Sequence, residues 1–342
     1  MHQRRPTLVQ VSRRAGVSVA SVSRALNGGP ASAATVRRVN EAVAELGYVP
    51  DATARLLKLG HAPAVAFAAA DMSNPVCVEM MSAMEHVFRA QGIRLTITSA
   101  GADPEGIAEL ADDLGRGMAD GLIISPLRQS PALSDALTRI AVPIVVLGRL
   151  DHADRLDQVR VDSAAGIGLA VDHLVDLGQR RIVLVNGPLD TTPGRSRAEG
   201  FRAASARHGL LPQEIVEAGD FTTESGELAV AQFLRDLPAP DAVIGANDLL
   251  AIGAMRALAA HGLRGGTDVA VAGVDDTRLT DLVYPSLTSV SLRSADRARI
   301  AAQLLVERIE RPSLAPRRID VEPTLTVRDS TLLSQSTRRL VP

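Results

Sequence analysis

Two different hydrophobic patterns divide the chain. Up to about residue 48 the apolar positions recur every three or four residues, as on one face of a helix, and no segment alternates with the two-residue period of a strand. From Pro63 onward, short apolar runs alternate with longer amphipathic stretches. This alternation is typical of parallel β-α-β units whose sheets are covered by helices on both faces. The pattern therefore predicts an all-α domain followed by an α/β core.

Three short helices are predicted in the first part of the chain. Thr7 begins a Thr-x-x-Gln capping box, and Gly16 can adopt the positive φ of the tight turn that follows the first helix. Ser18 is placed to cap a second helix, Val19–Leu26, and Ser32 to start a third. Two helices joined by so short a turn are typical of a helix–turn–helix, whose second helix enters the major groove of DNA. An ordinary three-helix bundle is the alternative.

Seven short segments in the second part of the chain are candidate strands: Ala64–Ala68, Arg94–Thr98, Gly121–Ile124, Ile144–Leu147, Ile182–Val185, Ala242–Ile244 and Val269–Ala272. The amphipathic stretches predicted to be helices include Val76–Ala90, Ala164–Leu177, Arg195–His208 and Leu249–His261. One compact sheet cannot hold so many units, so we expect two doubly wound parallel-sheet lobes. In such folds ligands bind at the carboxyl ends of the strands, here in the cleft between the lobes.

Four segments are expected along the chain. Residues 1–49 form the helix–turn–helix headpiece, and residues 50–60, bounded by a proline and a glycine, form a hinge that is too short to hold a helix alone. Residues 61–330 form the two-lobed core, and residues 331–342 form a tail.

Composition excludes several classes of protein. Of the 342 residues, 46% are hydrophobic and 22% are charged, which is typical of a chain with a large core and not of a disordered one. The longest apolar run, Ala64–Ala70, is too short to span a bilayer, and no secretory signal is visible. Cys77 is the single cysteine, which rules out an intrachain disulfide and a cysteine-based zinc site. We expect a cytoplasmic protein with no membrane partner, no cofactor and no metal.

Charge is distributed unevenly. The first 60 residues carry nine Lys or Arg against three Asp or Glu, a net charge of +6, so the other 282 residues carry a net −8. A basic head on an acidic body indicates a polyanionic partner, most often nucleic acid. A merely soluble basic segment is the alternative.

Several motifs together resemble the lactose/galactose-repressor (LacI/GalR) family. They comprise Thr7–Ser18, Ser21–Asn27, Glu45–Pro50, Ala54–Lys58, Ser73–Pro75, Asp120–Ile123, Val161–Asp162, His173–Gly178, Gly200–Phe201, Ala246–Asp248, Ala272–Asp276, Pro285–Val290 and Val327–Arg328. The resemblance covers about residues 6 to 330. It implies a helix–turn–helix headpiece, a core like that of periplasmic binding proteins, and a homodimer on a near-palindromic double-stranded DNA operator. The last twelve residues lack the leucine heptad by which some members become tetramers, so a dimer is expected.

The second helix of the headpiece carries the residues expected to read DNA. Val19 and Ala20 are placed for apolar contact with thymine methyls, and Arg24 for a guanine or a phosphate. Asn27, the last residue of the resembling stretch Ser21–Asn27, is also expected to bind DNA. Short hydroxyls that suit phosphate oxygens come from Thr7, Ser18, Ser21 and Ser23.

In the hinge, Leu57 matches the leucine that the family inserts into the minor groove at the operator centre. An apolar wedge unstacks one base step and kinks the duplex. The alternative is that Leu56, Leu57 and Leu59 pack on the core.

The resemblance also implies an effector site in the cleft. Arg197 matches the arginine that holds ligand hydroxyls or a carboxylate, and its rigid fork of donors suits vicinal hydroxyls. Asn247 and Asp275 match positions that hydrogen-bond the same ligand, and Phe221 matches an aromatic position that stacks on a sugar or base. Val76 is a further cleft position, and Val161 and Asp162 are expected at a strand end that faces the cleft. As alternatives, Asp275 or Asp276 caps a helix or pairs with Arg278, and Phe221 belongs to the core.

Three departures from the family pattern change the expected ligand. Gly148 and Arg149 stand where some members have an aspartate that grips sugar hydroxyls, and Pro193 replaces a common serine. Val76 and Cys77 replace the usual bulky aromatics after Asn74-Pro75. These changes enlarge and depolarise part of the pocket, so a lactose-like or purine-like ligand cannot be transferred from the family.

Enzyme motifs are absent from the sequence: it has no Gly-x-Ser-x-Gly elbow, no His-Glu-x-x-His and no phosphate-loop Gly-Lys-Ser/Thr. We therefore expect a DNA-binding repressor of a carbohydrate-utilisation operon, not an enzyme, controlled by a sugar or a sugar derivative. A purine- or nucleoside-responsive regulator that uses a corepressor is the alternative, and a sugar-binding sensor protein is another. The sequence does not distinguish an inducer from a corepressor.

Overall fold

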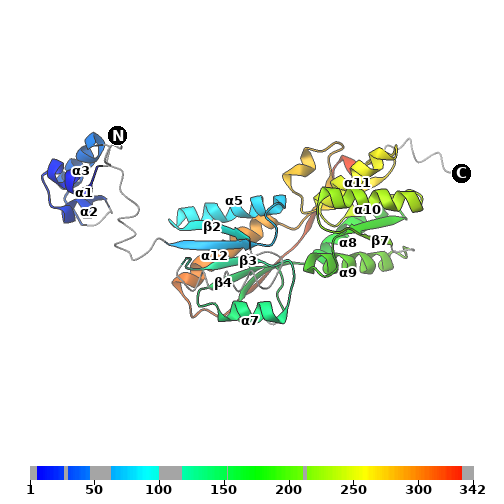
Figure 1. Ribbon diagram of the computed structural model, residues 1–342, viewed down its shortest axis with the longest axis horizontal. Coiled ribbons are helices and arrows are strands. Elements are labelled where there is room, and N and C mark those ends of the chain that lie inside the picture. The colour runs from blue at the N-terminus through cyan, green and yellow to red at the C-terminus, as the bar shows by residue number, and fades with distance from the viewer. Residues whose placement is uncertain are drawn as a thin grey trace. The chain divides into compact units, whose positions relative to one another are not determined.

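A computed structural model describes residues 6–26, 30–46, 63–99, 118–151, 153–210 and 214–332 (Figure 1). The chain divides into two compact units, Met1–Ala62 and Pro63–Pro342. The expected hinge at residues 50–60, Asn27 and Leu57 lie outside the described residues, as does all of the tail beyond residue 332.

The N-terminal unit contains the three helices that the sequence predicts: α1 (Leu8–Ala15), α2 (Val19–Leu26) and α3 (Ala33–Leu46). Thr7 forms the capping box of α1 with Gln10, and Gly16 ends this helix with a φ of 63°. The helices enclose a small apolar core, whose buried members are Val11, Ala15, Val22, Val39 and Ala42. The turn between α1 and α2 therefore follows from local signals, since its cap and its glycine are both visible in the sequence.

The first lobe of the core is built on a six-stranded sheet in the order β11-β5-β4-β3-β1-β2, and all of its neighbouring strands are parallel. Its strands are β1 (Ala64–Ala69), β2 (Arg94–Ser99), β3 (Leu122–Ser125), β4 (Ile144–Leu147), β5 (Asp157–Val161) and β11 (Arg318–Val321). Its helices are α5 (Pro75–Ala90), α7 (Pro131–Arg139) and α12 (Ser294–Glu310).

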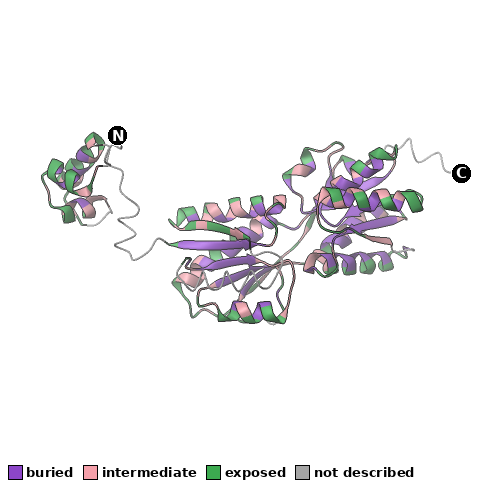
Figure 2. Cartoon of the chain, viewed as in Figure 1, coloured by how far each residue is buried: buried purple, intermediate pink, exposed green. Residues whose placement is uncertain are grey.

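Alternate residues of β1 face opposite sides of this sheet. Val65 and Phe67 belong to a cluster formed with α5 and α12, whereas Ala66 and Ala68 belong to a second cluster formed with α7. The period of two that directs side chains to both faces of a strand explains why this run is continuously apolar. Figure 2 shows the result, a buried strand layer between helices whose outer faces are exposed.

The second lobe has a six-stranded sheet with the corresponding strand order, β12-β10-β9-β8-β6-β7. Its strands are β6 (Ile182–Asn186), β7 (Glu214–Glu217), β8 (Ala242–Gly245), β9 (Ala270–Val274), β10 (Thr288–Ser291) and β12 (Thr324–Thr326). Its helices are α8 (Ser163–Asp176), α9 (Thr192–Arg207), α10 (Thr223–Asp236) and α11 (Asp248–Ala260), with short 3₁₀ turns at Arg278–Asp281 and Asp329–Thr331. Helices α10 and α11 lie on one side of the sheet and α9 on the other (Figure 1).

The chain crosses between the lobes three times. It passes from β5 to α8 and returns from β10 to α12, which packs on α5, β3, β4 and β5 of the first lobe. It then adds β11 to the first sheet and β12 to the second. Each lobe is therefore assembled from segments far apart in the sequence, and the crossing segments pass beside the cleft.

The seven predicted strands and four predicted helices are present, with ends that differ by up to three residues. Five further strands were not among the seven candidates: β5, of which only the end at Val161 was expected, and β7, β10, β11 and β12. Their sequences contain many polar and charged residues. Strands β7 and β11 lie at the edges of their sheets, where one side is open to water. Strand β10 is buried, but its residues Thr288 and Ser289 form hydrogen bonds to Ser330 and Asp248. The two predicted parallel-sheet lobes are confirmed, and among the described strands β12 alone is antiparallel to its neighbour, β10.

Candidate functional site

A cavity of about 670 Å³ lies between the two lobes of the core. Residues at the carboxyl ends of strands from both sheets line it, as is general for ligand sites in parallel α/β folds. All seven residues that the sequence predicts at the effector site line this one cavity: Val76, Val161, Asp162, Arg197, Phe221, Asn247 and Asp275. The structure thus brings the predicted set together.

Arg197 and Asp275 form the buried floor of the cavity. Nη1 of Arg197 donates to the carbonyl oxygen of Ala246 (2.6 Å), and its Nη2 lies 3.5 Å from Oδ1 of Asp275. Burial raises the pKa of Asp275 to about 6, although the guanidinium groups of Arg197 and Arg297 partly oppose this shift. Burial also lowers the pKa of Arg197. Such a desolvated pair presents both a donor fork and an acceptor to a polar ligand.

Asp275 has a strained backbone, with a φ of 111°. Positive φ is rare for a residue with a side chain and is common at functional sites, where the surrounding structure maintains it. Among the described residues, neither Asp275 nor Asp276 caps a helix or forms an ion pair with Arg278. The carboxylate of Asp276 pairs with Arg328 (2.8 Å), and the 3₁₀ turn that begins at Arg278 has no side-chain cap.

A hydrogen bond joins Asn247 to Phe221 on the second lobe. Oδ1 of Asn247 caps α11 by accepting a hydrogen bond from the Leu250 amide (2.8 Å), and Nδ2 donates to the carbonyl oxygen of Phe221 (3.0 Å). A Cβ added to Gly187 would lie 2.4 Å from the Phe221 ring, so the absent side chain makes room for this ring. Phe221 packs against the hydrophobic core of the second lobe and also lines the cavity. The alternative that Phe221 is only a core residue therefore accounts for part of its contacts.

Asp162 and Val161 lie where the chain crosses from β5 to α8. Oδ1 of Asp162 accepts a hydrogen bond from the Ala165 amide (2.9 Å) as the N-cap of α8. On the first lobe, Val76 lies in the first turn of α5 and is buried. Cys77 beside it donates to the carbonyl oxygen of Asp71, and burial raises the pKa of its thiol to about 11, so this thiol stays protonated at neutral pH.

Four arginines that were not predicted as site residues also line the cavity: Arg149, Arg160, Arg195 and Arg297. Arg149 pairs with Asp151 (2.9 Å), and Arg160 forms a two-pronged pair with Asp320 (both 2.9 Å). Arg160 was missed although its neighbours Val161 and Asp162 were expected at a strand end that faces the cleft. Arg149 was visible in the sequence only as a departure from the family pattern.

Asp248 is a further buried acid that the prediction missed. Oδ2 of its carboxylate accepts hydrogen bonds from the amide (2.8 Å) and hydroxyl (2.9 Å) of Thr277, and Oδ1 accepts one from Ser289 (2.5 Å). Burial and the neighbouring Asp275 raise the pKa of Asp248 to about 7. The sequence signal was present, because an aspartate follows Asn247 at the start of an apolar helix.

The second helix of the headpiece exposes the residues predicted to read bases. Val19 is 41% exposed, and Ala20 and Arg24 are exposed on the same helix. Oγ of Ser18 accepts a hydrogen bond from the amide of Ser21 (3.1 Å) and thus caps α2. The Oγ of Ser21 in turn accepts one from Nη2 of Arg24 (3.5 Å). Exposed Thr7 is engaged in its capping box, and Ser23 is half-buried.

Comparison with known proteins decides the family. Residues 7–51 match the model for bacterial regulatory proteins of the lacI family, and residues 171–331 match a periplasmic binding protein-like domain. The ribose operon repressor of Escherichia coli (strain K12) is 32% identical over 327 residues, which cover 95% of this chain and 99% of that repressor. The chain belongs to the lacI family of bacterial regulatory proteins.

Two solved structures resemble this lacI-family regulator over nearly its whole length. A crystal structure of the Lac repressor dimer bound to operator and the anti-inducer ONPF has a TM-score of 0.82 and 27% identity, covering 96% of this chain and 100% of that chain. A complex of the transcriptional regulator CelR with cellobiose has a TM-score of 0.72 and 31% identity, covering 95% and 100%. The predicted helix–turn–helix headpiece and two-lobed, periplasmic-binding-protein-like core are thereby confirmed.

Two further observations concern only the described part of this lacI-family chain. No helix there is long and apolar enough to cross a membrane. No group of three or more His, Cys, Asp or Glu side chains there is placed to hold a metal ion.

Proposed function

We propose that this lacI-family regulator represses a carbohydrate-utilisation operon as a homodimer, and that a sugar or sugar derivative bound between its lobes changes its affinity for operator DNA. One observation carries the proposal. A helix–turn–helix with exposed recognition residues shares its chain with a core whose interlobe cavity gathers Arg197, Asp275, Asn247 and Phe221. The names of its relatives, a ribose operon repressor and a CelR–cellobiose complex, support a carbohydrate ligand.

In this proposal each headpiece of the dimer reads one half of a near-palindromic operator. Val19 and Ala20 contact base edges, and Arg24 takes a guanine. Phosphate oxygens accept hydrogen bonds from the hydroxyls of Thr7, Ser18, Ser21 and Ser23. Asn27 extends this set, and Leu57 in the hinge enters the minor groove as a wedge.

The switch follows from where the cavity lies. Its walls come from both lobes, so a ligand that touches both favours one relative orientation of the lobes over another. A coupling of about 1–3 kcal/mol between the cavity and the operator corresponds to a change of about 5- to 150-fold in operator affinity.

The same proposal gives the chain four parts: a headpiece at residues 1–49, a hinge at 50–60, a core at 61–330 and a tail at 331–342. Its partners are DNA, a small molecule and a second copy of the chain. It has no catalytic role, needs no cofactor and acts in the cytoplasm, where its operator lies.

The test begins with the operator. The full-length protein selects binding sequences from a randomised DNA pool, and we expect a near-palindrome with a deformable central step. Operator affinity is then measured by fluorescence anisotropy with sugars, sugar phosphates, nucleobases and nucleosides added in turn. We expect a sugar or sugar derivative to shift the affinity, and the direction of the shift distinguishes an inducer from a corepressor.

Arg197→Ala is the matched variant for this test. An effect that persists in Arg197→Ala would contradict the cavity assignment, and a response to nucleosides alone would contradict the carbohydrate assignment. Failure of the wild-type protein to select any DNA sequence would overturn the proposal as a whole.

A further inference from the structure

Arg297 places a buried positive charge on the cavity wall. It lies near the start of α12, lines the cavity and is 7% exposed. Its Nε donates to the carbonyl oxygen of Leu292 (2.8 Å) and its Nη2 to Oγ of Ser294 (3.3 Å). Neither bond uses Nη1, and within the described ranges of the chain no carboxylate lies at ion-pair distance from this guanidinium. A buried charge without a counter-ion is unfavourable, so this arrangement calls for an anion.

The floor of the cavity holds more positive than negative charge. Arg197 and Arg297 are both buried, and Asp275 is the buried carboxylate that lines the cavity with them. Burial lowers the pKa of Arg297 to about 10, which still leaves it charged at neutral pH. Asp248 does not line the cavity, and with a pKa raised to about 7 it is only partly ionised at neutral pH.

Other carboxylates border the cavity but do not change this balance. All belong to exposed residues, where water screens their charge: Asp71, Asp151, Asp162, Glu199 and Asp320. Asp151 and Asp320 already pair with Arg149 and Arg160. The uncompensated charge is therefore the buried one on Arg297.

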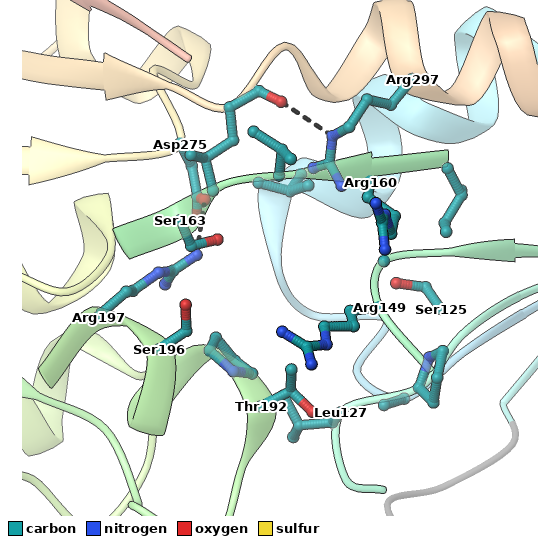
Figure 3. A pocket seen from close by; sticks show the side chains of 18 of the residues that line it. Ser125, Leu127, Arg149, Arg160, Ser163, Thr192, Ser196, Arg197, Asp275 and Arg297 are labelled. Atoms are coloured by element: carbon teal, nitrogen blue, oxygen red, sulfur yellow. Dashed lines mark hydrogen bonds and ion pairs between the residues drawn. The ribbon is translucent and has the colours of Figure 1, made fainter. Parts of the chain in front are cut away.

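The surrounding groups indicate what else the ligand carries. In Figure 3 the guanidinium ends of Arg149, Arg160, Arg197 and Arg297 border one open space, together with side-chain hydroxyls of Ser125, Thr192 and Ser196. Guanidinium groups bind carboxylate and phosphate through paired, charge-assisted hydrogen bonds. Hydroxyls and the Asp275 carboxylate suit the hydroxyl groups of a sugar.

We propose that the effector is an anionic sugar derivative, a polyhydroxy compound with a carboxylate or phosphate group whose oxygens bind Arg297, with Arg149 as a second contact. This inference rests on the proposed function, because it assigns the chemical class of the ligand of that same cavity.

Matched ligands test the charge directly. Binding of glucose, glucuronate and glucose 6-phosphate, and of ribose and ribose 5-phosphate, is measured by calorimetry and thermal shift on the full-length protein at constant ionic strength. Inorganic phosphate and sulfate are the minimal probes, with chloride as their reference. We expect an anionic member of a series to bind roughly tenfold or more tighter than its neutral counterpart. The carboxylate and phosphate members distinguish the two sources of the anion.

Variants assign the preference to its residue. Arg297→Leu is expected to abolish the preference for the anion and to keep the ligand-free protein folded, because it removes a buried unpaired charge. Arg297→Lys keeps a positive charge and is expected to keep part of the preference. Arg299→Leu on the same helix is the matched control, since its side chain is 48% exposed, pairs with Asp296 and does not line the cavity. Arg149→Ala changes an exposed residue, so it tests the second contact without risk to the fold.

Three results would overturn the inference. The first is that neutral sugars bind as tightly as their anionic counterparts. The second is that the preference for the anion persists in Arg297→Leu. The third is that the wild-type protein binds none of the matched ligands and neither phosphate nor sulfate. Operator selection by the ligand-free protein separates these results from failure of the proposed function. A regulator released from its operator by a neutral sugar alone keeps the proposed function and refutes the anionic effector.

Discussion

Arg197 and Asp275 face each other at the floor of the cavity, with Nη2 3.5 Å from Oδ1 and both side chains 8% exposed. The pair connects α9 to the residue that follows β9. Arg297 also acts on the Asp275 carboxylate, whose pKa it lowers. Among the described residues, Asp275 is thus within ion-pair distance of Arg197 alone, although the charge of Arg297 also reaches it, and one buried carboxylate stands against two buried guanidinium groups.

Asp275→Asn leaves Arg197 without its carboxylate partner, and its cost in free energy of unfolding is expected to be larger at pH 5 than at pH 8, because the pKa of Asp275 is raised to about 6 and ionisation of this carboxyl itself lowers the stability of the folded wild type. Asparagine tolerates positive φ better than most residues, so the 111° backbone is not the cause. The free energy of unfolding is measured with urea at both pH values. Asp281→Asn is the control, because this carboxylate is 68% exposed in its pair with Arg328 and is expected to cost less than about 1 kcal/mol. A cost of Asp275→Asn that is the same at both pH values would contradict the assignment.

Asp248 and Asp275 predict a pH dependence of stability. Their pKa values in the folded protein, about 7 and about 6, lie above the ordinary value of 3.8. Between about pH 4 and 7 the folded protein thus holds protons that the unfolded chain releases, so the stability contributed by these groups falls as the pH rises through this window. Asp248→Asn has no such proton to lose. Between about pH 5 and 8 the free energy of unfolding of the wild type should therefore fall by more than that of Asp248→Asn, whatever the variant's overall stability. Plots of the free energy of unfolding against pH that run parallel for the two proteins would refute this prediction.

Gly187→Ala should disturb the cavity through the Phe221 ring. The new Cβ would lie 2.4 Å from ring carbons, so the ring must move, and overpacking of this kind costs about 1–3 kcal/mol. We expect weaker effector binding as well as lower stability. Gly219→Ala is the matched control, because its nearest neighbour, Oγ of Ser225, would be 3.9 Å away. If both variants bind the effector like wild type, Phe221 is not a ligand contact.

Arg24→Ala tests the recognition helix. The loss of a guanine contact should weaken operator binding by about 1–3 kcal/mol and leave binding to random DNA nearly unchanged. Both are measured by anisotropy at one salt concentration, because phosphate contacts depend on salt. An equal loss on the two DNAs would make Arg24 a phosphate contact.

Much of the fold could be predicted because its signals are local. The capping box at Thr7, the left-handed Gly16 and the change of hydrophobic period after the headpiece each depend on a few neighbouring residues. The continuously apolar strands, such as β1, β4, β6 and β9, were equally visible, since a strand covered on both faces is apolar along its length, whereas the buried but polar β10 was not. The family motifs then indicated which residues meet in the cleft.

The sequence by itself determined the class of fold, the order of the headpiece and core, and the predicted site residues that line the cavity. Only the tertiary structure decided how each lobe is assembled from distant segments, and which charges share the cavity. Edge strands such as β7 and β11 lack a continuous apolar pattern because water or polar partners meet one of their faces. Arg297 resembles any other helical arginine in the sequence, since its burial and its lack of a carboxylate partner arise only when the chain crosses back from β10 to α12 and places it against the cavity.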